Sequence, residues 1–203
     1  MKFTLVKSSL FLLLGALLII SCEKKIAYTE IDDIALADET RTEDWLAYGR
    51  THNERRFSPL NDINTDNVAD LKVDWYMDLP NDIGLVSTPL VVDGILYFTG
   101  TMNIIRAVNA VSGELIWEYD PKVAEAIGNT RQVGWKDNRG ISFYKGKIFA
   151  ATWEGRLIAL DAKTGREIWT TQTFDRSRSL YITGAPKAFK GKVIIGNGGT
   201  ENG

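Results

Sequence analysis

The stretch that decides the fold reads IALDAKTGREIWTT, residues 158–171, because the chain contains a second copy of it. Residues 106–119 read RAVNAVSGELIWEY, and the two copies align without a gap at an offset of 52 residues. Apolar runs precede both copies at the same offset, GILYFTG before the first and GKIFAAT before the second. Short β-rich runs that recur at this period indicate a β-propeller or a related array of sheets.

Each repeat predicts the same order of elements: a strand, a hairpin, a strand, a tight turn and a last strand. The tight turn reads NAVSG in one copy and DAKTG in the other. Asn109 or Asp161 can bond the backbone that follows, and Gly113 or Gly165 can take a positive φ without steric cost. This turn chemistry is typical of a connection between two paired strands.

A tryptophan follows each turn at the same distance, Trp117 in the first copy and Trp169 in the second. A ring of this size buries on the order of 200 Å². We expect the indole to lie across the join between adjacent blades, against the small Ala107 or Ala159 of a neighbour. In this interpretation the repeated residues hold blades together and do not form a functional site.

Two partial copies flank the full ones. FKGKVIIGNG at residues 189–198 begins another copy, and LKVDWYMDLP at residues 71–80 ends an earlier one, with Trp75 in the role of Trp117. The sequence therefore predicts an all-β fold over residues 44–203, a partial β-propeller with four-stranded antiparallel blades. Because an open stack leaves sheet edges unpaired, which complete proteins avoid, we expect the chain to be the N-terminal part of a longer protein.

The composition limits the class of partner. With 44% hydrophobic and 25% charged residues, the chain is typical of a soluble globular protein. Its formal net charge of −2 provides no basic excess, so we predict no nucleic-acid partner. The single cysteine excludes a disulfide within one chain.

The first residues predict export. Lys2 and Lys7 precede an apolar run of eleven residues, LFLLLGALLII, which is too short to span a bilayer. The segment ends with IISC. This ending resembles a bacterial lipobox. We therefore interpret residues 1–21 as a lipoprotein signal peptide and Cys22 as the lipidated first residue of the mature protein. The alternative is an ordinary signal peptide with an incidental cysteine.

Residues 22–43 are mostly polar and charged, and we expect them to be a tether, with a short amphipathic helix as the alternative. Acyl chains on Cys22 would anchor the protein to a membrane. The predicted location is the periplasmic side of a bacterial membrane, and the sequence leaves the choice between inner and outer membrane open.

The repeated motif A-x-D/N-A-x-T/S-G-x-x-x-W resembles the tryptophan-docking motif of quinoprotein dehydrogenases, whose fold is an eight-bladed propeller. The resemblance is sharper to the methanol/ethanol type, which uses pyrroloquinoline quinone (PQQ), and it runs from about Asp44 to the last residue. An ordered set of stretches carries it: DWLAYGRTHNERRFSPLNDINTDNV, STPLVVDGILY, NRGI, RLIALDAKTG, TGAP and GKVIIGNGGTE.

This resemblance implies oxidation of an alcohol to an aldehyde or ketone, with cytochrome c or a quinone as electron acceptor. It also implies two cofactors: PQQ, a planar quinone with three carboxylates, and a calcium ion that polarises the quinone. The catalytic aspartate that the family implies lies beyond Gly203, so we assign no catalytic residue within this chain. The chain alone is not expected to be active.

The resemblance assigns two polar side chains to the cofactor. Arg139, in NRG, matches the arginine that pairs with a PQQ carboxylate, a task that suits a planar guanidinium. Thr183, in TGAP, matches a threonine whose hydroxyl bonds PQQ. Without the family, these two residues would be interpreted as a surface arginine and an ordinary strand threonine.

The resemblance also assigns a glycine-rich loop. Gly198, Gly199 and Thr200 match a loop whose backbone approaches PQQ closely, which would explain the small residues. Glu201, the next residue, matches a calcium ligand. The alternative for this loop is a plain glycine turn.

The sequence departs from the family pattern in two features, which involve three residues. Many members have a glutamate that contacts the cofactor where Val86 stands in GLVSTP. Many also have a vicinal pair of cysteines that stacks on PQQ, and here the corresponding residues are Val133 and Gly134, beside Trp135. These departures bear on substrate class and cofactor affinity rather than on the propeller.

A second interpretation comes from another class of protein: a lipid-anchored propeller of PQQ-like repeats that is a scaffold for protein assembly and not an enzyme. The stretches NRG, TGAP and GGTE favour the dehydrogenase, because a scaffold has no use for an arginine and a calcium-type glutamate at cofactor spacing. Val86 and the absent cysteine pair favour the scaffold.

Overall fold

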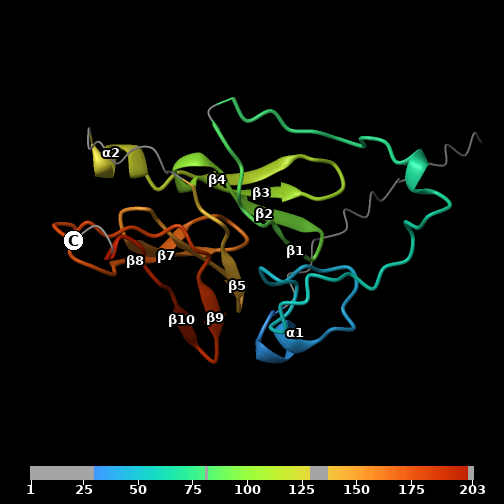
Figure 1. Cartoon of the computed structure of the whole chain (residues 1–203), viewed down its shortest axis with the longest axis horizontal. Helices are drawn as coiled ribbons and strands as arrows, with labels where there is room; N and C mark the ends of the chain where they lie inside the picture. The colour runs from blue at the N-terminus through green and yellow to red at the C-terminus, as the bar shows by residue number, and fades with distance from the viewer. Residues whose placement is uncertain (1–29, 81, 129–136, 201–203) are drawn as a thin grey trace, which may run out of the picture.

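Two four-stranded antiparallel sheets form the body of the molecule (Figure 1). The computed structural model describes residues 30–80, 82–128 and 137–200. In the first sheet the spatial order follows the chain: β1 (Leu90–Val92), β2 (Ile95–Thr99), β3 (Ile105–Asn109) and β4 (Leu115–Tyr119). The second sheet repeats this order with β5 (Ser142–Tyr144), β6 (Lys147–Ala151), β7 (Arg156–Asp161) and β8 (Glu167–Gln172). A hairpin of β9 (Lys187–Phe189) and β10 (Lys192–Ile194) lies beside β5 and begins a third unit.

The two full sheets share their irregularities as well as their order. In both, the register shifts once between the third and fourth strands, after Ala107 in one sheet and after Ala159 in the other. In both, a two-residue turn joins the first two strands, and its second residue is a glycine at positive φ, Gly94 or Gly146. Such turns match the natural twist of a hairpin. The predictions of an all-β fold and of four-stranded antiparallel blades are confirmed.

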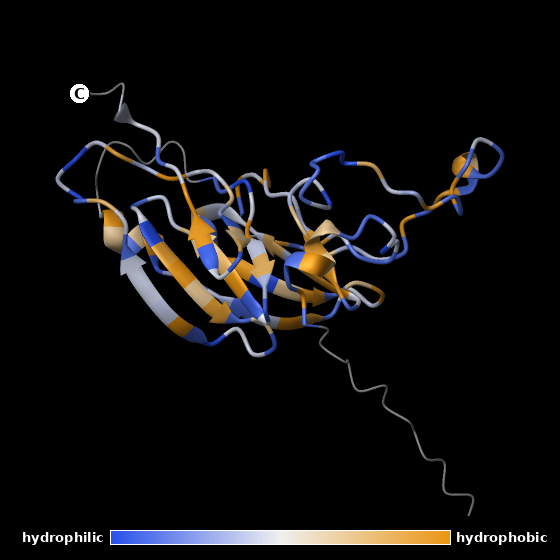
Figure 2. Ribbon diagram, turned by 90° about the horizontal axis from the view of Figure 1, so that it is seen from below, coloured by the Kyte–Doolittle hydropathy of each residue, from blue (hydrophilic) through white to orange (hydrophobic). Residues whose placement is uncertain are grey.

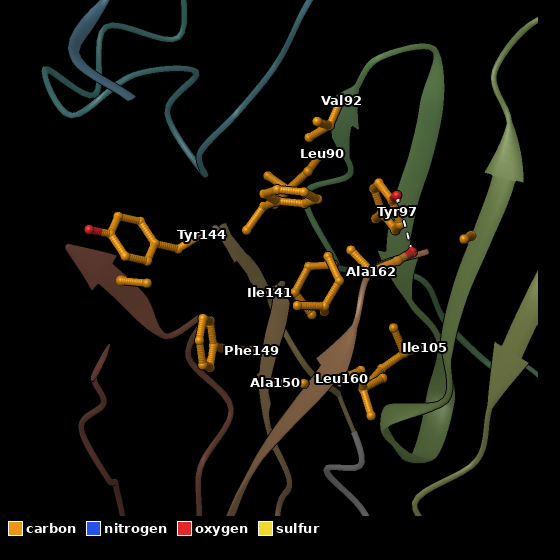
Figure 3. Packing of buried hydrophobic residues seen from close by; sticks show 14 of the residues in the cluster. Leu90, Val92, Tyr97, Ile105, Ile141, Tyr144, Phe149, Ala150, Leu160 and Ala162 are labelled. Atoms are coloured by element: carbon orange, nitrogen blue, oxygen red, sulfur yellow. Dashed lines mark hydrogen bonds between the residues drawn. The ribbon is translucent and has the colours of Figure 1, made fainter. Parts of the chain in front are cut away.

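The core lies between the two sheets and contains side chains from both of them (Figure 3). The ring of Tyr97 lies 5.8 Å from that of Phe143, centroid to centroid. The Tyr97 hydroxyl donates to the carbonyl of Ala162, 3.3 Å away, in the β7–β8 turn. The aliphatic side chains around them are fully buried: Leu90, Ile95, Ile105, Ile148 and Ile158. Apolar burial of this kind stabilises a fold by roughly 25 cal/mol per Å².

Tryptophans join neighbouring units, as predicted, but their contacts differ from the predicted ones. The indole N–H of Trp117 donates to the carbonyl of Ala162, 2.9 Å away, in the next sheet. A Cβ on Gly165 would lie 2.7 Å from the same ring, so the indole rests on the turn itself. Ala107 faces Trp117 from the adjacent strand of the same sheet. The contact therefore needs the turn glycine rather than the predicted alanines.

Trp75 repeats this arrangement one unit earlier. Its indole N–H donates to the carbonyl of Ala110 at 3.1 Å, and a Cβ on Gly113 would lie 2.6 Å from its ring. Residues 72–78 nevertheless form no strand, which differs from the predicted end of a blade. The reason is that no described strand pairs with this segment.

Trp169 has a different environment from the other two. Its side chain is 37% exposed, against 9% for Trp117. It lies at an open cavity of about 470 Å³ between β5–β8 and the β9–β10 hairpin, with Phe149 and Val193 among the lining residues.

The structure differs from the predicted tether at residues 31–36, which pack against the sheets. Ile31 and Leu36 are buried in the main core. Helix α1 (Asp33–Ala37) forms here because the Asp32 carboxylate accepts from two backbone N–H groups of its first turn. The charged residues around these two apolar side chains conceal the segment's role in the sequence. Residues 22–29 lie outside the described residues.

Asp33 fixes this N-terminal segment to two separate hairpins. Its carboxylate accepts from the hydroxyl of Tyr144 at 2.9 Å and from the backbone N–H of Lys190 at 2.7 Å. The backbone N–H of Lys145 also donates to the carbonyl of Ile31, 2.7 Å away. The segment therefore connects the second sheet with the β9–β10 hairpin at one end of the molecule.

Residues 57–73 form an arm that reaches away from the sheets (Figures 1 and 2). Several of its apolar side chains are more than half exposed: Phe57, Ile63, Leu71 and Val73. Helix α2 (Val123–Ile127) follows β4 and packs against Trp153 at the other end of the sheets. Within the described ranges, no helix has the length and apolar character needed to cross a membrane.

Candidate functional site

The loops that lead into β1, β5 and β9 are joined by backbone hydrogen bonds. The N–H of Thr88 donates to the carbonyl of Arg139 at 3.0 Å, and the N–H of Arg139 donates to the carbonyl of Thr183 at 2.9 Å. A parallel bridge also pairs Thr88 with Gly140. The repeat explains this row of three hydrogen-bonded loops, because the same short loop precedes the first strand of each unit.

The structure brings two predicted cofactor residues into contact. The Arg139 guanidinium donates to the hydroxyl of Thr183, 2.5 Å away. Arg139 is exposed and Thr183 is half-buried, so the pair faces solvent. Within the described part of the chain, Arg139 pairs with no carboxylate. A guanidinium that has no counter-charge among the described residues, and that lies beside a hydroxyl, favours an anionic ligand.

Asn138 lies directly before Arg139 and is almost fully buried, with 2% of its surface exposed. Its side-chain NH₂ donates to the carbonyl of Ala151 at 2.6 Å, and its side-chain oxygen accepts from the N–H of Gly140 at 2.7 Å. Its backbone carbonyl accepts from the hydroxyl of Thr99 at 3.3 Å. Asn138 is not among the site residues predicted from the sequence. The only available signal was an asparagine directly ahead of an Arg-Gly pair.

The glycine-rich loop lies beside the segment that carries Thr183. An antiparallel bridge pairs Gly198 with Tyr181, and the Gly198 N–H donates to the Tyr181 carbonyl at 2.8 Å. The Tyr181 ring stacks on Trp153 with 5.8 Å between centroids and 8° between planes. Gly199 and Thr200 line a cavity of about 290 Å³ together with the segment 177–180. The predicted residues therefore fall into two groups, connected through Tyr181.

The two glycines of this loop have a packing role in addition to the predicted cofactor role. A Cβ on Gly198 would lie 2.9 Å from the Tyr181 ring. A Cβ on Gly199 would lie 2.1 Å from the carbonyl oxygen of Ser179, and Gly199 also has a φ of 93°. Small residues are therefore required here by the protein's own packing, whatever ligand approaches.

A buried ion pair between Arg106 and Asp82, with the exposed Glu118 as a second partner of Arg106, anchors the loop that leads to Thr88. The Arg106 guanidinium lies 3.0 Å from the carboxylate of Asp82 and 2.8 Å from that of Glu118. Asp82 also accepts from the backbone N–H of Thr101. The ion pair fixes the start of the segment that carries Val86, whose side chain is 50% exposed. Removing Arg106 would leave the buried Asp82 carboxylate without its counter-charge.

Several predicted positions lie outside the described residues: Cys22, Val133, Gly134, Trp135 and Glu201. Among the residues that the structure does describe, no three His, Cys, Asp or Glu side chains gather where a metal ion could bind. The described donors, the guanidinium of Arg139 and the hydroxyl of Thr183, suit an anionic ligand. The predicted calcium site depends on Glu201 and stays a prediction.

The comparison with known families identifies the class of protein. The model of the glucose/ethanol/alcohol dehydrogenase β-propeller domain matches residues 45–202. The chain belongs to this family, and the propeller fold follows from it. The predicted resemblance to PQQ-dependent quinoprotein alcohol dehydrogenases is confirmed.

Individual relatives agree with this assignment. The dehydrogenase subunit of a quinone alcohol dehydrogenase from Komagataeibacter europaeus is 47% identical, over 78% of this chain and 22% of that protein. The quinohemoprotein alcohol dehydrogenase ADH IIB of Pseudomonas putida is 48% identical, over 85% of this chain and 25% of that protein. The crystal structure of the quinohemoprotein alcohol dehydrogenase from Comamonas testosteroni superposes with a TM-score of 0.77 at 44% identity, over 84% of this chain and 26% of that one. The chain thus spans about a quarter of the length of the relatives it matches.

Proposed function

We propose that the whole protein is a PQQ- and calcium-dependent dehydrogenase that oxidises alcohols to aldehydes or ketones. The observation that carries the proposal is the contact between Arg139 and Thr183, which presents a cation and a hydroxyl to solvent with no described carboxylate opposite them. Family membership supports the same chemistry. The electron acceptor would be cytochrome c or a quinone.

The two side chains have distinct tasks in this proposal. Arg139 binds a carboxylate of PQQ through guanidinium N–H groups that Thr183 does not use. The Thr183 hydroxyl accepts from Arg139, so its own proton remains to donate to a ligand oxygen. Together they set the orientation of the ring system. When bound, PQQ supplies the hydride acceptor for alcohol oxidation.

Two parts of the proposal rest on the sequence alone. Glu201 is proposed as a calcium ligand, since a carboxylate oxygen suits this hard cation. Cys22 is proposed as a lipid anchor that holds the protein on the periplasmic side of a bacterial membrane. Metabolic labelling with a radioactive fatty acid tests the anchor. The native protein should become labelled, whereas the Cys22→Ser variant should not.

The cofactor proposal is tested by reconstitution. The whole protein is incubated with PQQ and calcium, separated from free cofactor, and assayed for absorbance of bound PQQ and for dye reduction with primary alcohols. We expect both signals. Arg139→Ala should weaken PQQ binding by about 10- to 150-fold, because a charge-assisted hydrogen bond contributes about 1.5–3 kcal/mol.

Arg166→Ala is the matched control, because Arg166 is an exposed arginine in the β7–β8 turn of the same sheet. It should bind PQQ as the native protein does. Absence of both absorbance and dye reduction in the native protein would favour the scaffold interpretation instead.

A further inference from the structure

The side chain of Asn138 closes a small ring of atoms around Arg139. Its oxygen accepts from the N–H of Gly140, two residues on, which is the hydrogen bond of an Asx-turn. Arg139 is the residue in the middle of that turn. The direction in which its side chain leaves the backbone is therefore tied to the Asn138 carboxamide.

Asn138 connects this turn to two different sheets, through its side chain to one and through its backbone carbonyl to the other. Its NH₂ donates to the carbonyl of Ala151, the last residue of β6. The backbone carbonyl of Asn138 accepts from Thr99, the last residue of β2. With 2% of its surface exposed, Asn138 has no solvent to replace these partners.

Arg139 depends on this anchor because its side chain has few contacts of its own. It is exposed, and among the described residues its guanidinium bonds only to Thr183. A long, flexible side chain that is held at one end keeps its orientation only if its backbone is fixed.

We infer that Asn138 is the positioning residue of the candidate cofactor site, which holds the Arg139 guanidinium on Thr183 and toward an anionic ligand. Asparagine is required because the position needs one donor for Ala151 and one acceptor for Gly140. Aspartate has the same shape but turns an acceptor toward the Ala151 carbonyl. The effect on the ligand rests on the proposed function, whereas the effect on Arg139 does not.

The first test needs no ligand. Backbone amide exchange is measured by NMR in the chain and in its Asn138→Asp variant. We expect the amides of Arg139, Gly140 and Thr88 to exchange at least about tenfold faster in the variant, while those of the β2–β3 ladder keep their relative order. Unchanged exchange at Arg139 and Gly140 would overturn the inference.

Asn109→Asp is the matched control. The Asn109 side-chain oxygen accepts from the N–H groups of Val111 and Ser112, and Asp161 has the same role in the other copy of the turn. This variant should leave the exchange of Arg139 unchanged. If Asn138→Asp does not fold, Thr99→Val removes a single bond to the Asn138 carbonyl and should accelerate the same amides in the same direction.

The second test measures PQQ affinity in the whole protein by tryptophan fluorescence. Asn138→Asp should raise the dissociation constant by on the order of tenfold, and should add nothing in an Arg139→Ala background. The same factor in both backgrounds would show that Asn138 does not act through Arg139, and would overturn the ligand part. If the native protein binds no PQQ, the proposed function and the ligand part both fail, and amide exchange alone decides the positioning part.

Discussion

The indole of Trp117 lies directly on the α-carbon of Gly165, so that a single added methyl group would come within 2.7 Å of the ring. This contact between a strand residue of one sheet and a turn residue of the next joins the two repeats in addition to the core between them. The contact also accounts for the repeated motif in the sequence, because each unit contributes one indole and one glycine turn. The same relationship holds between Trp75 and Gly113.

Gly165→Ala should destabilise the protein more than Gly146→Ala does. Both glycines have a φ of 70°, but only Gly165 has a ring against it, whereas the Cβ of residue 146 would meet open space. We expect about 1–2 kcal/mol for Gly146→Ala from the left-handed backbone alone. Overpacking should add about 1–3 kcal/mol for Gly165→Ala. Urea unfolding of the two variants measures the difference, and equal losses would mean that the indole does not rest on this turn.

The tryptophans should differ in their contribution to stability. Trp117→Phe removes the hydrogen bond to Ala162 and part of a buried contact, so we expect a loss of about 1.5–3 kcal/mol in the free energy of unfolding. Trp169→Phe affects a ring that is 37% exposed and should cost less than about 1 kcal/mol. Chemical denaturation of both variants provides the comparison. A larger loss at Trp169 would contradict the observed difference in burial.

The N-terminal segment should behave as part of the folded body. Leu36 is buried in the main core, so Leu36→Ala should lower the free energy of unfolding by about 2–4 kcal/mol. Ile34 is a control on the same short helix, because it is 80% exposed and its change to alanine should cost within about 0.5 kcal/mol. Similar small effects at both positions would restore the tether interpretation.

Asp33 should make stability depend on pH in the acid range. The backbone N–H of Lys190 holds the pKa of the Asp33 carboxyl below its usual value, with help from the Tyr144 hydroxyl. A carboxyl whose pKa is lower in the folded state stabilises it fully above about pH 4, and loses that effect as pH falls through the folded pKa. The difference in Tm between the native chain and Asp33→Asn should therefore be steady near neutral pH and shrink below about pH 4. A difference that is independent of pH would contradict this origin.

The repeat made the fold readable from the sequence. Two copies at one offset predicted the order of the strands, the position of each turn and the tryptophans that join the units. They could do so because every copy has the same strands, the same turn and the same packing against its neighbour. The alanines were predicted as the surface beneath the indoles because they are small. The structure shows that a turn glycine has that place, since an indole needs a bare α-carbon to lie against.

The parts that escaped prediction depend on segments far apart in the chain. Ile31 and Leu36 are isolated apolar residues among charges, and only the sheets that they lie against explain their burial. Asn138 has the sequence context of a turn residue, whereas its hydrogen bonds to Thr99 and Ala151 join it to strands distant in the chain. Arg139 and Thr183 were found through family resemblance, and their contact could not be inferred from their spacing.

The backbone bonds among Thr88, Arg139 and Thr183 have a consequence for the length of the loops that carry them. The loops that precede β1, β5 and β9 form one hydrogen-bonded row. Adding or removing a residue in any of these loops would therefore misalign the neighbouring loops as well. The identity of the side chains along the row can therefore change while the length of each loop stays constant.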